Sequence, residues 1–203
     1  MSKRIIIAVA PTGGWGKGRG NPVSPETIAR DVIACANTGA AVVHLHARDE
    51  NGNLSADLAC FNQAVETIKA SCDIIVEAST GGLSLLTAVE RALPAAHPHA
   101  DLASLNMGSL NFGDQVYCNA LPDVRLWIDK MTAAGVKPSL EVFDTGTWKR
   151  PCTSSTRGSL LNPAISASSL MSAGACPMTR CCWTTLFRVS PQEANGGHCS
   201  LAA

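Results

Sequence analysis

The segment AAVVHLHARDENG, residues 40–52, decides the fold because an apolar run ends there in two histidines and a polar turn. The spacing predicts a buried strand over 40–46, and the Asn-Gly pair that follows indicates a turn. Successive side chains of a strand point to opposite faces, so His44 and His46 lie on the same face. This segment therefore predicts a buried strand that carries two imidazoles at its carboxyl end.

Working outward, the same pattern of strand and helix recurs about every 30 residues, which is typical of βα units with a parallel sheet. The first helix is expected to begin at Ser24 and Pro25 and to end before Gly39. The expected strands cover residues 4–9, 40–46, 73–79, 100–109 and 137–146, and the expected helices cover 25–38, 57–71, 84–93 and 122–135.

Five βα units fit either an open doubly wound sheet or the first part of a (β/α)8 TIM barrel. Polar residues at the carboxyl ends of successive strands favour the barrel, because its active sites are built there. We therefore expect an α/β fold, an incomplete TIM barrel over residues 1–148. The polar residues at these strand ends are His44, His46, Ser79, Thr80, Ser104, Asn106, Glu141 and Asp144.

The pattern stops after Trp148, and residues 149–203 are rich in serine and cysteine with Glu193 as their one carboxylate. We interpret this tail as translated out of frame, since codon choice permits RPCTSSTR to be read as Ala-Met-Tyr-Ile-Lys-His-Glu after a shift. A disordered low-complexity tail is the alternative, although such tails rarely contain much cysteine and tryptophan. Sequencing the DNA around codons 147–151 distinguishes them, because an intact single frame would contradict the shift.

Composition narrows the class of protein. The formal net charge is zero, which argues against binding to nucleic acid or to an anionic membrane. No apolar run reaches the roughly 20 residues of a membrane helix, and the basic, apolar start is better read as a strand than as a secretory signal. Cysteines scattered singly before residue 149 are typical of reduced thiols, so we expect a cytoplasmic protein.

Two imidazoles on one face at the end of a strand suit a divalent metal, most plausibly zinc. A catalytic zinc usually has a third protein ligand and an open position. The alternative is that one histidine belongs to a hydrogen-bond network and the other has no special role.

Three further features bear on chemistry. The STGG turn, residues 79–82, can hold a carboxylate through backbone N–H groups, or it is a plain glycine-rich turn. The glycine-rich segment 13–20 lacks both the P-loop ending and the dinucleotide spacing, so nucleotide binding is rejected. Glu141 lies inside an apolar strand, where a carboxylate is costly unless it is paired, near a metal or catalytic.

Together these residues resemble the β-keto acid cleavage enzymes, among them the 3-keto-5-aminohexanoate cleavage enzyme. The resemblance covers residues 4–147 and none of the tail. Its motifs are specific in combination, and they read GNPVSPETIARDV, GAAVVHLHARDENG, STGG, ASLNMGSLNFG and KPSLEVFDTG.

The resemblance implies an oligomeric zinc-dependent barrel of amino acid catabolism, which exchanges a β-keto acid and acetyl-CoA for acetoacetate and a new CoA thioester. It implies that His44 and His46 bind one catalytic zinc, which polarises the keto oxygen. It implies that Glu141 is the acidic catalytic residue. The residues that would grip the substrate are Ser79, Gly82, Ser104 and Asn106.

The family pattern also includes a third zinc ligand, a Glu from a late strand, with a catalytic Asp and a substrate-binding Arg nearby. None of these can be placed in the tail, where Glu193 lies in the unrelated segment SPQEANGG. We therefore expect the chain as written to be inactive or to misfold. Two other functions stay open: a barrel zinc hydrolase, and a non-catalytic fragment that binds intact barrel subunits.

Overall fold

The computed structural model describes residues 6–12, 21–141, 166–167 and 185–187. Its elements follow the order β1 (Ile6–Val9), α1 (Pro25–Asn37), β2 (Val42–Leu45), α2 (Ala59–Ser71), β3 (Ile75–Ala78), α3 (Ala88–Arg91), the 3₁₀ helix η1 (Leu93–Ala96), β4 (Leu102–Asn106), β5 (Leu110–Phe112), β6 (Gln115–Tyr117), α4 (Leu121–Ala134), β7 (Lys137–Glu141), β8 (Ser166–Ala167) and β9 (Thr185–Phe187). Among the described residues no helix is long and apolar enough to cross a membrane.

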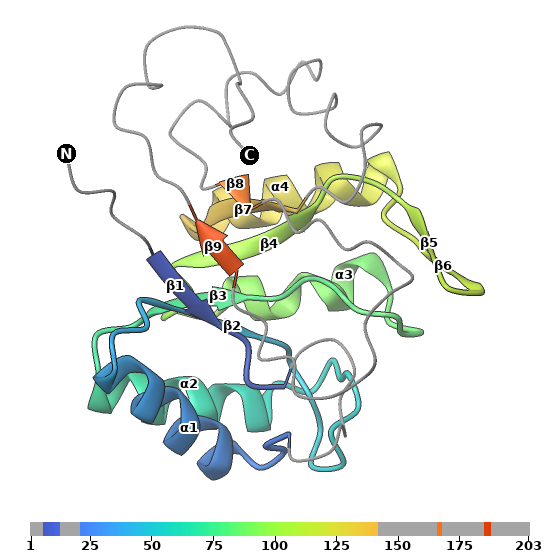
Figure 1. Ribbon diagram of the computed structural model, residues 1–203. Coiled ribbons are helices and arrows are strands. Elements are labelled where there is room, and N and C mark those ends of the chain that lie inside the picture. Colours follow the sequence, from blue (N-terminus) through green and yellow to red (C-terminus); the bar gives the residue numbers. More distant parts are fainter. Residues whose placement is uncertain (1–5, 13–20, 142–165, 168–184, 188–203) are drawn as a thin grey trace, which may run out of the picture.

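The main sheet has the strand order β8-β7-β4-β3-β2-β1-β9, and strands β1, β2, β3, β4, β7 and β8 are mutually parallel. Each of the βα strands lies beside the next βα strand along the chain, without the reversal of order that defines a doubly wound sheet. The sheet is curled, with β9 antiparallel to β1 at one edge (Figure 1). The expected α/β fold, part of a TIM barrel, is confirmed.

Helices cover the outside of this sheet and bury the core (Figure 1). Helices α1 and α2 lie side by side. They present Val32 and Ile68 to strand residues such as Val43 and Val76, all at most 1 % exposed. Trp127 of α4 is fully buried, and its indole N–H donates to the Ala88 carbonyl at 2.8 Å, which holds α4 against α3. Burial of an aromatic side chain of this size stabilises the fold by roughly 3 kcal/mol.

The expected start of the first helix is confirmed. The Ser24 hydroxyl accepts from the Thr27 N–H at 3.3 Å, and Pro25 occupies the first turn, where its missing N–H costs nothing. Gly39 follows the helix with φ +106°, a backbone conformation that residues other than glycine rarely adopt.

One expectation needs correction, and one element was missed. The helix expected over 84–93 is confined to α3, because a capping box between Thr87 and Glu90 fixes its start, and η1 then continues through Pro94. The β5–β6 hairpin was not anticipated, although a Gly-Asp pair between short alternating runs is a hairpin signal. Apart from β8 and β9, the expected tail of 149–203 lies outside the described residues, as does 142–146 of the fifth strand.

Candidate metal and substrate site

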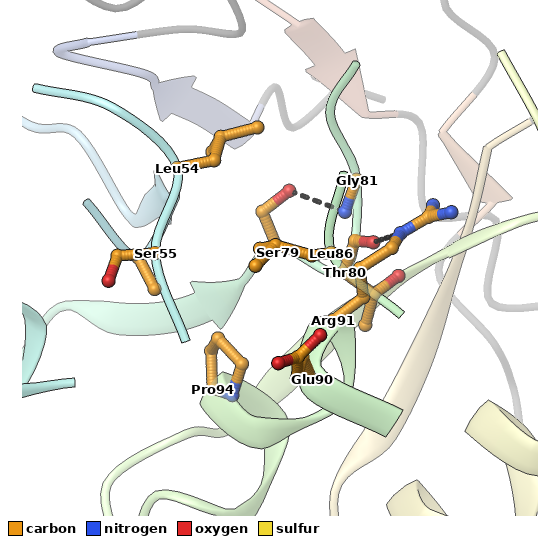
Figure 2. Close-up of a pocket in the computed structure, with 10 residues that line it drawn as sticks. Leu54, Ser55, Ser79, Thr80, Gly81, Leu86, Glu90, Arg91 and Pro94 are labelled. Carbon is orange, nitrogen blue, oxygen red and sulfur yellow. Dashed lines mark hydrogen bonds between the residues drawn. The ribbon is translucent and has the colours of Figure 1, made fainter. Parts of the chain in front are cut away.

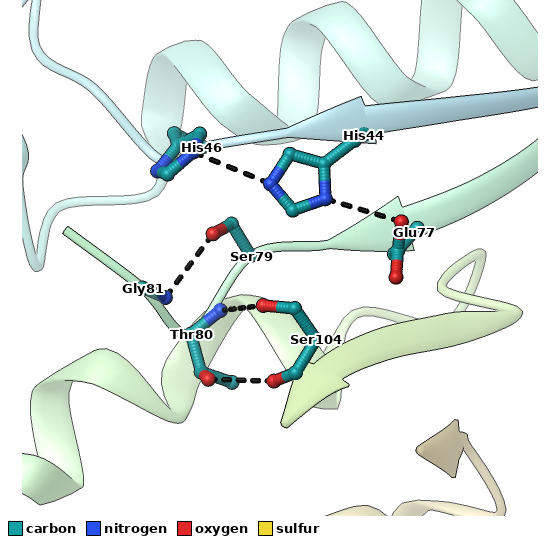
Figure 3. Close-up of polar contacts among 7 residues, drawn as sticks. All are labelled: His44, His46, Glu77, Ser79, Thr80, Gly81 and Ser104. Carbon is teal, nitrogen blue, oxygen red and sulfur yellow. Dashed lines mark hydrogen bonds and ion pairs between the residues drawn. The ribbon is translucent and has the colours of Figure 1, made fainter. Parts of the chain in front are cut away.

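His44 of β2 and His46, which follows the strand, meet at its carboxyl end (Figure 3). The Nε2 atoms of His44 and His46 lie 3.3 Å apart. The other ring nitrogen of His44, Nδ1, lies 3.1 Å from Glu77 Oε2, and Glu77 is the residue of β3 in register with His44. Glu77 is 4 % exposed, so a buried carboxylate fixes the orientation of the first imidazole. A carboxylate behind a histidine in this way is typical of metal sites.

The electrostatics of the two rings differ. Burial lowers the pKa of His44, but the hydrogen bond and the charge of Glu77 outweigh it, so the net pKa is raised. Burial, together with the charges of His44 and Arg48, lowers the pKa of His46 well below its usual value. For Glu77 burial acts to raise the pKa, yet the contact with His44 prevails and lowers it. His46 is thus held neutral, the form that ligates a metal.

The separation of the two Nε2 atoms provides a test of whether a metal fits. Two ligands at the usual Zn–N distance and a tetrahedral angle are about 3.3 Å apart, and the structure gives 3.3 Å. A hydrogen bond between two neutral imidazoles spans the same distance. Among the described residues no group of three or more His, Cys, Asp or Glu side chains converges on one point. The spacing of the two Nε2 atoms thus fits two ligands of a zinc ion, and a third ligand is not found among the described residues.

Glu141 ends β7, opposite Asn106 of β4 in the sheet register. The surrounding protein removes most of the hydration of its carboxylate and raises its pKa to about 7. The charge of His44 lowers this pKa and that of Glu77 raises it, so the three groups share one electrostatic environment. A carboxyl group with this pKa exchanges a proton near neutral pH.

The predicted STGG turn is tied to the neighbouring strand (Figure 3). The Thr80 N–H donates to Ser104 Oγ at 3.1 Å, and the Thr80 hydroxyl donates to the Ser104 carbonyl at 2.6 Å. The Gly81 N–H donates back to Ser79 Oγ at 3.1 Å. These bonds fix the turn beside the histidines, but they engage two of the hydroxyl groups expected to grip a substrate.

Gly82 ends this turn with φ +131°, and a Cβ added there would collide with Leu54. Its N–H, expected to hold a substrate oxygen, donates to Tyr117 Oη at 3.0 Å. The conformation therefore favours glycine at position 82, and a Cβ there would also push the Leu54 methyl aside.

Asn106 is fully buried, and neither its Oδ1 nor its Nδ2 has a hydrogen-bond partner within the described part of the chain. Buried amides are almost always paired, so such a group indicates a ligand or water. It lies beside Gly81, since a Cβ added at Gly81 would be 3.3 Å from Asn106 Nδ2.

Arg91, which ends α3, holds the turn from its other side. Its Nε donates to the Thr80 carbonyl at 2.8 Å, and its two terminal nitrogens donate to Cys118 O at 2.8 Å and Asn119 Oδ1 at 2.7 Å. Its guanidinium stacks over Trp127 at 4.3 Å from the ring centroid. The hairpin and the turn are thus joined through one cation.

A small pocket lies on the Arg91 side of the turn (Figure 2). It has room for about one water molecule, so it does not accommodate a substrate. Of the residues predicted to bind substrate, Ser79 lines it.

The structure brings together the predicted residues His44, His46, Ser79, Gly82, Ser104 and Asn106, with Glu141 on the adjoining strand. Sequence reasoning missed Glu77, although a carboxylate inside an apolar strand is the same signal that drew attention to Glu141. It also missed Arg91 and Tyr117. Outside this site, His97 is buried at 9 % exposure and packs edge-on against Phe61.

Comparison with known proteins identifies relatives. Residues 4–183 match the family model described as beta-keto acid cleavage enzyme. The chain is 43 % identical over 170 residues to the 3,5-dioxohexanoate:acetyl-CoA acetone transferase of Paraburkholderia graminis, a match that covers 70 % of this chain and 55 % of that protein. It is 34 % identical over 151 residues to the 3-keto-5-aminohexanoate cleavage enzyme of Fusobacterium nucleatum, covering 72 % of this chain and 55 % of the relative.

Solved structures agree on the fold. The complex of ObcA with oxaloacetate has a TM-score of 0.61 at 24 % identity, over 70 % of this chain and 34 % of that chain. The chain spans about half the length of the curated relatives it matches.

Proposed function

The chain belongs to the β-keto acid cleavage enzyme family, and from that premise we propose that it acts in zinc-dependent cleavage of a β-keto acid with acetyl-CoA. In this reaction the two-carbon acid end of the substrate joins the acetyl group to form acetoacetate, and the remaining acyl group leaves as a CoA thioester. Relatives named as acetyl-CoA transferases and cleavage enzymes support this class of reaction.

The observation that carries the zinc part of the proposal is the convergence of two Nε2 atoms at 3.3 Å, with a buried carboxylate behind one ring. His44 and His46 would hold the ion, and Glu77 would keep the His44 ring in place. When bound, Zn²⁺ supplies Lewis acidity toward the keto oxygen of the substrate.

The chain's own residues supply orientation and proton transfer. Asn106 offers an unpartnered amide at the end of β4, and the turn at Ser79 lies beside it. Glu141, whose pKa is raised to about 7, would hold or release a proton at its carboxyl oxygen as bonds to the substrate change. A bound cation would lower this pKa, which favours the ionised, proton-accepting form.

Two histidines make an incomplete zinc site, because catalytic zinc has three protein ligands in its common sites. We propose that the described part of the chain lacks the third ligand, so that the chain binds zinc weakly and turns over slowly. Resequencing the codons around 147–151 tests whether the tail is in frame.

Activity is tested by incubating the full chain with zinc, a β-keto acid and acetyl-CoA labelled with ¹³C in its acetyl group. Transfer predicts labelled acetoacetate, detected by mass spectrometry, and it predicts no product when acetyl-CoA is omitted. A barrel hydrolase would instead consume its substrate without acetyl-CoA. Labelled acetoacetate formed at the rate of an intact family member would contradict the proposed impairment.

Matched variants assign the metal. His44→Ala and His46→Ala are expected to lose zinc binding in a competition assay with a coloured chelator. His99→Ala removes an exposed imidazole, and it should bind zinc as the unaltered chain does.

A further inference from the structure

Tyr117 ends β6 and projects from the hairpin toward the STGG turn. Its side chain is buried, with the residue 8 % exposed, and the Arg91 guanidinium lies 5.5 Å from the centroid of its ring. Phe112, across the hairpin, packs edge-on against the same ring. The phenol is therefore held firmly, and its hydroxyl has a fixed position.

That position is among the residues expected to bind substrate. Tyr117 Oη accepts the Gly82 N–H at 3.0 Å. It also fills the space that a Cβ at Gly81 would need, a point that lies 3.3 Å from Asn106 Nδ2 and 3.4 Å from Ser79 Oγ. Three polar groups from three strands or their ends thus surround the backbone of one glycine.

Two of these groups have unused hydrogen-bonding capacity. The amide of Asn106 has no partner among the described residues. Tyr117 Oη accepts the Gly82 N–H and faces Arg91, which is also a donor, so neither contact uses the hydrogen of the phenol. A buried hydrogen-bond donor without a partner lowers the stability of the fold. A ligand with several oxygen atoms would accept from both the Asn106 amide and the Tyr117 hydroxyl.

We propose that Tyr117 is a substrate-binding residue, which donates its phenol hydrogen to an oxygen of the β-keto acid beside Asn106. The inference rests on the proposed function and adds a contact from the hairpin to it. The Gly82 N–H polarises the phenol, so the hydroxyl is a better donor than an isolated one. Burial raises the pKa of Tyr117 to about 12, so the group keeps its hydrogen at neutral pH.

A purely structural role predicts something different. If the hydroxyl serves to pair the Gly82 N–H, its hydrogen-bonding state does not change when substrate arrives. If it contributes to the site, it changes from an acceptor alone to an acceptor and donor.

The sequence contains one tyrosine, so a single label reports on it. The full chain, prepared with zinc and with tyrosine ¹³C-labelled at Cζ, is titrated with acetoacetate as the β-keto acid. We expect the single resonance to move and to saturate together with binding measured by calorimetry. Binding with an unmoved resonance would overturn the assignment of Tyr117 alone, whereas no binding would overturn it together with the proposed function.

The variant Tyr117→Phe keeps the ring and removes the hydroxyl. We expect it to bind acetoacetate roughly tenfold more weakly, the usual loss for a hydrogen bond to a charged group. Val116→Ala is the matched control, because Val116 is a neighbour on the same strand and is 59 % exposed. Equal affinity of Tyr117→Phe and the unaltered chain would contradict the proposal, as would tighter binding by the variant.

Discussion

Glu77 Oε2 lies 3.1 Å from His44 Nδ1, and this contact joins β3 to the imidazole pair of β2. It determines which nitrogen of His44 faces His46, because the other is engaged by the carboxylate. The geometry of the pair therefore depends on a residue that is not expected to touch the metal.

Replacing this carboxylate tests the contact. Glu77→Gln is expected to weaken zinc binding by about 10- to 100-fold, since loss of the charge makes the His44 ring less basic and less well oriented. Chelator competition measures the affinity, and Glu66→Gln, which removes an exposed carboxylate from α2, is the control. Unchanged affinity in Glu77→Gln would show that the contact is not part of a metal site.

The turn after β3 should be sensitive to a single methyl group. Gly82→Ala is expected to lower the free energy of unfolding by about 2 kcal/mol, because the backbone at φ +131° is strained for a residue with a Cβ and the Leu54 methyl must move aside. Gly113→Ala also has positive φ, but nothing lies within 4 Å of its Cβ, so about 1 kcal/mol is expected. Urea unfolding compares them, and equal losses would contradict the greater strain expected at Gly82.

Replacing Arg91 with lysine should lower the free energy of unfolding. Arg91→Lys retains the charge but loses the planar group that stacks on Trp127 and reaches Thr80, Cys118 and Asn119 together. We expect a loss of about 2 kcal/mol in urea unfolding.

The control for this substitution is Arg125→Lys on the exposed face of α4, which should change stability little. Similar values for the two lysine variants would mean that Arg91 contributes through its charge alone.

His97 should give stability a dependence on pH. Burial, followed by the charge of His99, lowers its pKa below 6.5, while Glu66 opposes the shift. The unfolded chain therefore binds more protons than the folded chain, and the contribution of His97 is complete above pH 6.5 and declines as the pH falls toward its folded pKa.

The variant His97→Asn removes this titration and should lose less stability on acidification than the unaltered chain. Urea unfolding at a series of pH values from 7.5 downward measures the difference, in which the titrations of His44 and His46 cancel. Parallel curves for the two proteins would count against a buried, neutral His97.

Much of the fold was predictable because its signals are local. Ser24 and Pro25 mark the start of a helix in any context, and the apolar strands of a covered parallel sheet stand out in the sequence. The short α3 was not predictable in the same way. Its apolar periodicity extends over 84–93, but the cap at Thr87 overrides the first part of it.

The site was predictable where its residues end strands. His44, Ser79, Asn106 and Glu141 each belong to a strand or follow one directly, so one rule about barrels brings them together. Arg91 and Tyr117 escape that rule because their roles depend on contacts between a helix, a hairpin and a turn. Such contacts connect residues distant in sequence, and no spacing reveals them.

The base and the tip of the β5–β6 hairpin differ in how closely they are joined to the rest of the fold. Its base carries Tyr117, which accepts the Gly82 N–H of the turn, and adjoins Asn119, which accepts from Arg91. Its tip at Gly113 and Asp114 lies away from the sheet (Figure 1). We therefore expect insertions at the tip to leave the βα framework and the histidine pair undisturbed. For protein engineering, the tip of this hairpin is therefore a place where a loop or tag can be inserted without redesign of the βα framework.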